Sequence, residues 1–339
     1  MSGGSFQGGV SVRLYACPAC GARLYFRNSA CGACGVRVVY SDARDAFVAN
    51  ADSCSNREDI GCNWADEDVV EHLCRSCQMT DVIPDLSVEP NAALWAEGET
   101  AKRWVLATLS RWGWFGAEDP GPLPVFHFKS ERTHAGPERV MMGHAAGVIT
   151  LNVAEADDAI RVRNREMLDE EYRTMLGHLR HELAHFIFDR LAAEPGFSEA
   201  FRALFGDERT DYGEALRRHY SEGPRAEWSG RFITPYASAH PHEDWAETVA
   251  HLMHLTDIVD AATAVELAWP TTDGVPADAY ETTDSDALIH AAVDLGLALN
   301  QVNRAMGLAD LYPFVLTEAV RDKLAFSHFW LNRRARLQS

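Results

Sequence analysis

The chain has 339 residues, 47% of them hydrophobic, which is enough for one large domain or two modest ones. It carries 31 Lys and Arg against 50 Asp and Glu, a formal net charge of -19 that argues against nucleic acid, anionic membranes and acidic substrates as partners. The first residues, MSGGSFQGGV, show no export signal, and no later segment stays apolar for the ~20 residues of a membrane helix. We therefore expect a cytoplasmic protein.

The 8 cysteines all lie in the first 77 residues, and their spacing indicates metal binding. Thiols in a protein without an export signal should stay reduced. Two CxxC turns flank GARLYFRNSA, a segment of the size that a ribbon hairpin needs, and together they predict a tetrahedral four-thiolate zinc site. A second, less regular quartet contains one CxxC pair. The two predicted ligand sets are Cys17, Cys20, Cys31 and Cys34, and Cys54, Cys62, Cys74 and Cys77.

This N-terminal segment is too polar to build a sufficient core unaided, whereas a structural zinc site supplies on the order of 10 kcal/mol of folding free energy. Buried free thiols are the alternative, but the crowding of cysteines argues against it. We predict a double zinc-ribbon module over residues 1–83 and a linker over 84–93, within the stretch MTDVIPDLSVEPN.

Residues 1–40 contain four arginines and no acidic residue. This surface could contact a protein or another anionic partner, or it could be a solvated face, and the composition favours the solvated face.

After the linker, the composition is that of a mainly helical domain, which we assign to residues 94–339. Residues 94–115 have the pattern of an amphipathic helix, and LPVFHF (123–128) and GVITLNV (147–153) that of short strands. Between residues 168 and 191 the apolar residues recur at helical spacing, and Pro195-Gly196 ends this run.

The sequence HELAH lies within this last predicted helix. His181 and His185 are four residues apart and project from one face, so both can bind one zinc ion, while Glu182 can take a proton from a water that the metal activates. A chance match and satisfied core histidines are the alternatives. Burying three ionisable groups on one turn without a metal would cost several kcal/mol, which favours the zinc site.

A third ligand is expected in SAHPHEDWAETVAHLMH. Pro241 suits the first position of a helix, and Glu243, Glu247 and His251 then follow at four-residue intervals along one face. Glu243 could instead be a first-turn acid favoured by the helix dipole. Either glutamate could bind the metal while the other orients a ligating histidine.

These segments carry a family resemblance. GHAAGVITLNVAEADDAIR, YRTMLGHLRHELAHFIFDRL, FGDERTDYGEALRRHY and YASAHPHEDWAETVAH, with the double CxxC ribbon, CNW and IPDL, resemble the bacterial zinc-binding metallopeptidase family that has an N-terminal zinc ribbon. The resemblance spans nearly the whole chain. EDWAE is also similar to the E-x-x-A-[D/E] helix of gluzincin peptidases, which implies that Glu243 is the third ligand and that Glu247 supports a ligating histidine.

The resemblance implies an α+β, zincin-like fold with a mainly helical peptidase domain and a small mixed sheet. The edge strand of a zincin sheet pairs with the substrate backbone, so residues 147–153 form either this edge strand or an ordinary core strand.

We expect a peptidase with one catalytic and two structural zinc ions, with Glu182 as general base and a peptide or protein as substrate. The alternative is a catalytically inert or regulatory adaptor whose ribbons bind a protein or nucleic-acid partner. The candidates for stabilising the oxyanion are Tyr212, His219, Tyr236 and His251.

Overall fold

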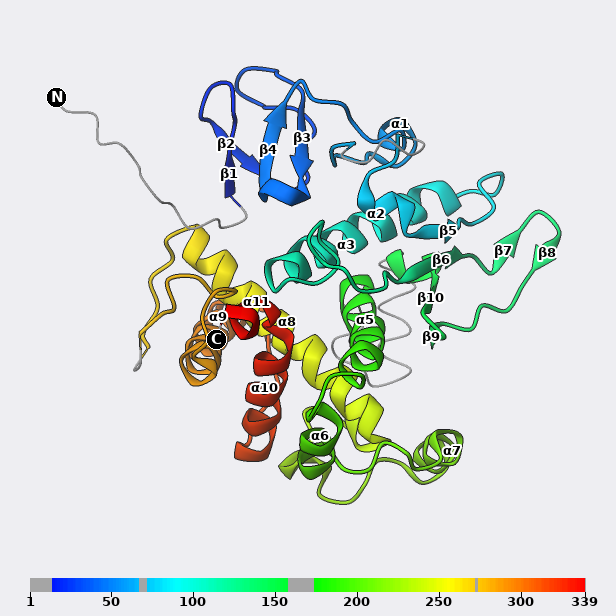
Figure 1. Ribbon diagram of the computed structural model, residues 1–339, viewed down its shortest axis with the longest axis vertical. Helices are drawn as coiled ribbons and strands as arrows, with labels where there is room; N and C mark the ends of the chain where they lie inside the picture. Colours follow the sequence, from blue (N-terminus) through cyan, green and yellow to red (C-terminus); the bar gives the residue numbers. More distant parts are fainter. Residues whose placement is uncertain (1–13, 67–71, 158–173, 272–273, 339) are drawn as a thin grey trace.

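The computed structural model describes residues 14–66, 72–157, 174–271 and 274–338. The described elements confirm the expected α+β class: small hairpins, one four-stranded sheet and several long helices (Figure 1). The strands are β1 (Leu14–Ala16), β2 (Arg23–Tyr25), β3 (Val38–Ser41), β4 (Ala46–Ala49), β5 (Thr80–Val82), β6 (Val125–Lys129), β7 (Arg132–Thr133), β8 (Gly136–Pro137), β9 (Gly143–Ala145) and β10 (Val148–Asn152). The helices are α1 (Arg57–Ile60), α2 (Arg75–Gln78), α3 (Asn91–Arg111), α5 (Met175–Leu191), α6 (Phe197–Phe205), α7 (Tyr212–Glu222), α8 (Pro241–Ala264), α9 (Ser285–Ala305), α10 (Glu318–Leu331) and α11 (Arg333–Gln338).

The N-terminal hairpins β1–β2 and β3–β4 are antiparallel and enclose a small aromatic core. The fully buried ring of Tyr40 packs against Phe26, Phe47 and Trp64. Its hydroxyl donates a hydrogen bond of 2.9 Å to Asp45. The segment lies beside α3 (Figure 1), with α1 and α2 in contact with that helix.

The four-stranded sheet has the order β5-β6-β10-β9. β5, β6 and β10 are parallel, and β9 is antiparallel to β10. Alternate side chains of β6 and β10 point into the core, where Phe126, Phe128, Ile149 and Leu151 are buried. The possibility that residues 147–153 form the edge strand is therefore wrong: β10 is internal, and β9 occupies the edge beside α5.

The ends of the predicted elements shift by a few residues. The helix expected at 94–115 is α3, which begins at Asn91 and ends at Arg111. The helix expected at 168–191 is described from Met175 to Leu191, and residues 168–173 lie outside the described part. β5, from the segment assigned to the ribbon module, pairs with β6. The boundaries at residues 83 and 93 stay predictions.

Helix α8 is the centre of the helical part, in contact with α5, α9 and α10 (Figure 1). It begins with Pro241 at its start, as the sequence predicts, and the His240 ring caps it by accepting a hydrogen bond from the backbone of His242. The indole of Trp245 donates a hydrogen bond of 2.8 Å to the Ala184 carbonyl and so joins α8 to α5. Among the described helices, none has the length and apolar composition that crossing a bilayer requires.

Replacing two glycines in long helices by alanine should have opposite effects on the free energy of unfolding. A Cβ atom at Gly98 of α3 would lie 2.8 Å from the fully buried ring of Phe128, so the packing there would have to shift, whereas one at Gly296 of α9 would meet Tyr312 at an ordinary 3.7 Å. Alanine is otherwise the better helix former. We expect Gly98→Ala to lower the free energy of unfolding by about 1 kcal/mol and Gly296→Ala to raise it by a similar amount. Urea denaturation of the zinc-loaded protein measures both, and equal stability of the two variants would contradict the described packing.

Candidate metal centres and active site

The first cysteine quartet comes together as the sequence predicts. The thiols of Cys17, Cys20, Cys31 and Cys34 lie within 4.8 Å of one another. The Sγ atoms of Cys17 and Cys34 are 3.8 Å apart, and those of Cys20 and Cys31 are 3.7 Å apart. Sulfur atoms in a tetrahedral shell with Zn–S bonds of ~2.3 Å are separated by about 3.8 Å, so this spacing fits a four-thiolate zinc site.

The second quartet has the same spacing but is more deeply buried. Sγ of Cys62 lies 3.7 Å from that of Cys74 and 3.8 Å from that of Cys77, and all four thiols of the quartet, including Cys54, are buried. The buried cations Lys102 and Arg103 of α3 act electrostatically on Cys77 and Cys62. They offset the negative charge that thiolates would bring into the interior.

The third cluster joins α5 to α8. Nε2 of His181 lies 3.1 Å from Nε2 of His185 and 3.1 Å from Oε2 of Glu243. Nε2 of His185 lies 3.6 Å from Oε1 of Glu243. Ligand atoms around a tetrahedral zinc with bonds of 2.0–2.1 Å are separated by about 3.3 Å, so these three side chains fit one ion.

Glu243 has the environment of a carboxylate that needs a cation. Its side chain is 1% exposed, and Oε2 has no hydrogen bond within the described part of the chain. Burial would raise the pKa of Glu243, but the neighbouring His181 and His185 lower it well below its usual value. Two imidazole nitrogens facing a buried carboxylate form a donor set suited to zinc.

The position of the cluster follows from local structure. His181 and His185 lie one helical turn apart on α5, and Glu243 lies in the first turn of α8. The hydrogen bond from Trp245 to Ala184 joins α8 to α5 close to Glu243 and His185. This bond fixes α8 against α5 at the level of the site.

Glu247 contacts the opposite side of the His181 ring. Its Oε1 lies 2.7 Å from Nδ1 of His181, and its Oε2 accepts a hydrogen bond of 2.8 Å from Thr234. Burial would lower the pKa of His181, but Glu243 and Glu247 raise it well above its usual value. A carboxylate at Nδ1 holds the ring so that Nε2 faces the cluster. Sequence reasoning missed Thr234, which lies in an irregular segment without a motif.

Three of the four oxyanion candidates lie around this cluster. The hydroxyl of Tyr212 donates a hydrogen bond of 2.6 Å to Oε1 of Glu243. The ring of Tyr236 lies 6.2 Å from that of His181 and 5.7 Å from that of His219. Burial raises the pKa of Tyr212 and of Tyr236, and the Glu243 charge adds to both shifts.

His251 is buried one turn beyond Glu247, and its Nδ1 lies 2.9 Å from the hydroxyl of Tyr312. Glu182 is half-buried on α5 beside His181, and its charge contributes to the raised pKa of Tyr212. The ring of His242 lies 6.3 Å from that of His185.

Two protein-family models match the parts of the chain that contain these clusters. Residues 91–330 match the family described as "Putative zinc-binding metallo-peptidase". The chain belongs to this family. The match confirms the resemblance inferred from the sequence, and residues 14–88 match a zinc-ribbon domain, which contains both cysteine quartets.

The relatives that align with most of the chain carry no stated activity. Over 332 residues, the chain is 40% identical to uncharacterized proteins of Mycobacterium bovis and Mycobacterium tuberculosis, with 94% of each chain covered. No solved structure matches the chain. The matches thus establish the family and the zinc-ribbon domain.

The two cysteine quartets should lose zinc at different rates. Cys20 and Cys34 of the first quartet are exposed, whereas the second quartet is entirely buried. A chelator must reach the metal through its ligands, so we expect the first site to release zinc before the second. Stopped-flow measurement with a chromophoric chelator, with Cys20→Ser to identify the first site, tests this order. Release in a single phase from both sites would contradict it.

Proposed function

We propose that the protein is a zinc-dependent peptidase in which His181, His185 and Glu243 hold one catalytic zinc ion. The supporting observation is the convergence of two imidazole nitrogens and a buried carboxylate next to Glu182. Zinc held there supplies a Lewis acid that acidifies water and polarises a carbonyl group. Together with the two cysteine quartets, this makes three zinc ions per chain.

Glu182 is the proposed general base. It neighbours His181 on α5 and is half-buried. The carboxylate takes a proton from the water that attacks the scissile carbonyl and then gives it to the amine that leaves when the C–N bond breaks.

Glu243 is the proposed third ligand, and Glu247 is the acid that orients His181. Glu243 faces the Nε2 atoms of both histidines, whereas both oxygens of Glu247 are occupied by Nδ1 of His181 and the hydroxyl of Thr234. This division of contacts supports the gluzincin-like assignment.

Among the oxyanion candidates, Tyr212 and Tyr236 have the better support. A tyrosine hydroxyl keeps its proton at neutral pH and can donate a hydrogen bond to a developing oxyanion, and burial raises the pKa of both further. Burial lowers the pKa of His219, which disfavours its charged form. The contact of His251 with Tyr312 and its deep burial favour a packing role.

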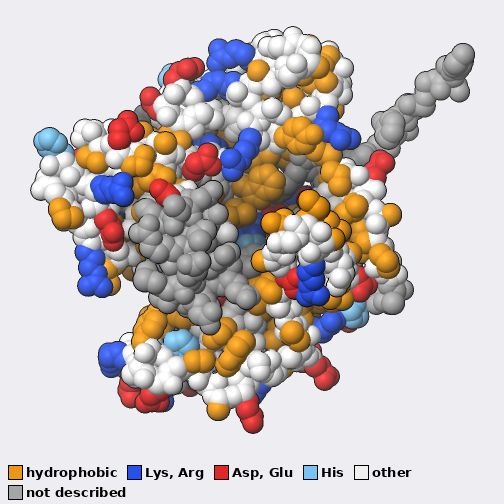
Figure 2. Space-filling model, turned by 180° about the vertical axis from the view of Figure 1, so that it is seen from behind, with side chains coloured by type: hydrophobic (Ala, Val, Ile, Leu, Met, Phe, Trp, Pro, Cys, Tyr) orange, Lys and Arg blue, Asp and Glu red, His pale blue; other side chains and the backbone are white. Residues whose placement is uncertain are grey.

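The substrate is proposed to be a peptide or protein. Among the described strands, β9 ends the four-stranded sheet beside α5, and an extended peptide added there would form a further strand. On the face that Figure 2 shows, acidic and basic side chains are interspersed, which gives no support to a nucleic-acid partner on that face. The unpaired cysteines are consistent with a cytoplasmic location.

Replacing the base should separate chemistry from metal binding. We expect Glu182→Gln to keep three zinc ions and the fold but to hydrolyse casein at least ~100-fold more slowly, because general-base catalysis contributes that much. Glu199→Gln, an exposed acid on α6, is the matched control and should keep full activity. Equal activity of Glu182→Gln and wild type would sink the proposed mechanism, and a zinc-loaded but inactive wild type would favour the adaptor.

Replacing Glu243 and replacing Glu247 should have different effects on zinc binding. Glu243→Ala removes a direct ligand, so the zinc count should fall from three to two at sub-micromolar free zinc. Glu247→Ala leaves three ligands and a poorly oriented His181, so the metal should stay with its affinity lowered roughly 10- to 100-fold. Elemental analysis and chelator competition measure both. Loss of zinc from Glu247→Ala alone would reverse the two roles.

A further inference from the structure

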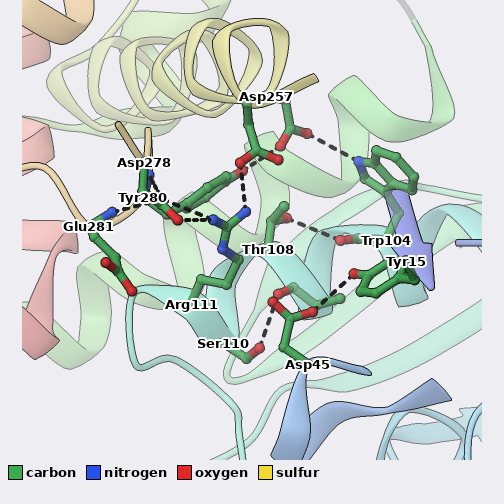
Figure 3. A network of polar contacts seen from close by, with 12 residues as sticks. Tyr15, Asp45, Trp104, Thr108, Ser110, Arg111, Asp257, Asp278, Tyr280 and Glu281 are labelled. Carbon is green, nitrogen blue, oxygen red and sulfur yellow. Dashed lines mark hydrogen bonds and ion pairs between the residues drawn. The ribbon is translucent and has the colours of Figure 1, made fainter. Parts of the chain in front are cut away.

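Asp257 of α8 is a junction between three other parts of the chain. Its Oδ2 accepts a hydrogen bond of 3.1 Å from the indole of Trp104 on α3 and also contacts Arg180 on α5. Its Oδ1 accepts a hydrogen bond from the hydroxyl of Tyr280. Figure 3 shows Trp104 and Tyr280 approaching this carboxylate from different sides.

On the α5 side, the junction reaches the residue that precedes His181. The side chain of Arg180 is 1% exposed, and its guanidinium contacts Asp257 and Nδ1 of His254, both on α8. A buried guanidinium is costly unless a carboxylate neutralises it. The carboxylate of Asp257 therefore stabilises the packing of α5 on α8 through the residue that precedes His181.

On the α3 side, the junction reaches the first zinc ribbon. The ring of Trp104 packs edge-on against Phe26, with centroids 5.2 Å apart. Phe26 is 4% exposed and lies between the two CxxC turns of the first quartet. Zinc held by this quartet would fix the segment that carries Phe26, and so the surface against which Trp104 packs.

A second ion-pair group lies beside the junction. Arg111 of α3 contacts Asp260 at 2.8 Å and both oxygens of Asp278 at 2.8 and 2.9 Å. Its guanidinium also lies 4.2 Å from the ring centroid of Tyr280. Tyr280 is thereby held where its hydroxyl meets Asp257 (Figure 3).

We propose that Asp257 is a positioning residue that couples the first zinc ribbon to the catalytic zinc site through Phe26, Trp104 and Arg180. The inference rests on the proposed function, because it concerns the affinity of that third site for zinc. Zinc in the ribbon holds Trp104 on Asp257, and Asp257 holds α5 in the arrangement that brings His181 and His185 to Glu243. By linkage, zinc in the catalytic site raises the affinity of the ribbon by the same factor. The ribbon then acts within the chain, as a support for the active site.

The decisive variant is Trp104→Phe, which keeps an aromatic ring beside Phe26 and removes the N–H that binds Asp257. We expect it to weaken zinc binding at the catalytic site by about 2- to 30-fold, the range found for residues in coupling networks. Trp269→Phe is the matched control, because the Trp269 indole donates a hydrogen bond of the same 3.1 Å to the Ala291 carbonyl. It should leave the affinity unchanged. Asp257→Asn should weaken binding at least as much as Trp104→Phe.

The double variant Cys20→Ser/Cys34→Ser tests the contribution of the first zinc ribbon, because it removes two exposed thiols of the first quartet. Zinc affinity of the full-length protein is measured by chelator competition. Co²⁺ substitution distinguishes the catalytic site from the cysteine sites, because the catalytic site has no sulfur ligand and its Co²⁺ spectrum therefore differs. The coupling predicts weaker catalytic-site binding in this variant and little further loss when Trp104→Phe is added.

Wild-type affinity in folded Trp104→Phe and Asp257→Asn would overturn the positioning role. Wild-type affinity in the ribbon variant would overturn the coupling to the ribbon. A wild-type protein with zinc only in the cysteine sites would instead refute the proposed catalytic site itself, and the coupling with it.

Discussion

The burial of the Glu243 carboxylate is the constraint on which the site depends. A carboxylate with 1% exposure is stable only if charged or hydrogen-bonding partners surround it. Here the partners are His181 and His185 from α5 and the Tyr212 hydroxyl from α7. Three helices must therefore meet at one point, and a zinc ion in their midst would satisfy the same charge.

Other acids of α8 also have charged partners on neighbouring helices. Asp244 pairs with Lys323 of α10 at 2.6 Å, Asp257 with Arg180 of α5, and Asp260 with Arg111 of α3 at 2.8 Å. These three acids of α8 thus meet cations from three different helices. Pairs of this kind add little net stability over apolar packing, but breaking one leaves an uncompensated buried charge, so they specify one arrangement of the helices.

The sequence predicted the local parts of this architecture well, because their signals are short-range spacings. CxxC turns, the four-residue interval of the histidines and the proline at the start of α8 each lie within a few residues. The long-range parts carry no such signal. The edge strand β9 is only Gly143–Ala145, which lacks strand-forming residues, so the sequence pattern points to the apolar segment 147–153 as a possible edge. Trp104 and Asp257 are 153 residues apart, and only the fold brings them together.

The central claim is that the histidines of α5 and Glu243 of α8 form one metal site. Crystallographic diffraction data from the zinc-loaded protein, collected on both sides of the zinc absorption edge, test it most directly. The account predicts three anomalous peaks per chain: one in each cysteine quartet and one touching Nε2 of His181, Nε2 of His185 and a carboxylate oxygen of Glu243. Peaks in the cysteine quartets alone, or a third peak that touches Glu247 in place of Glu243, would contradict it.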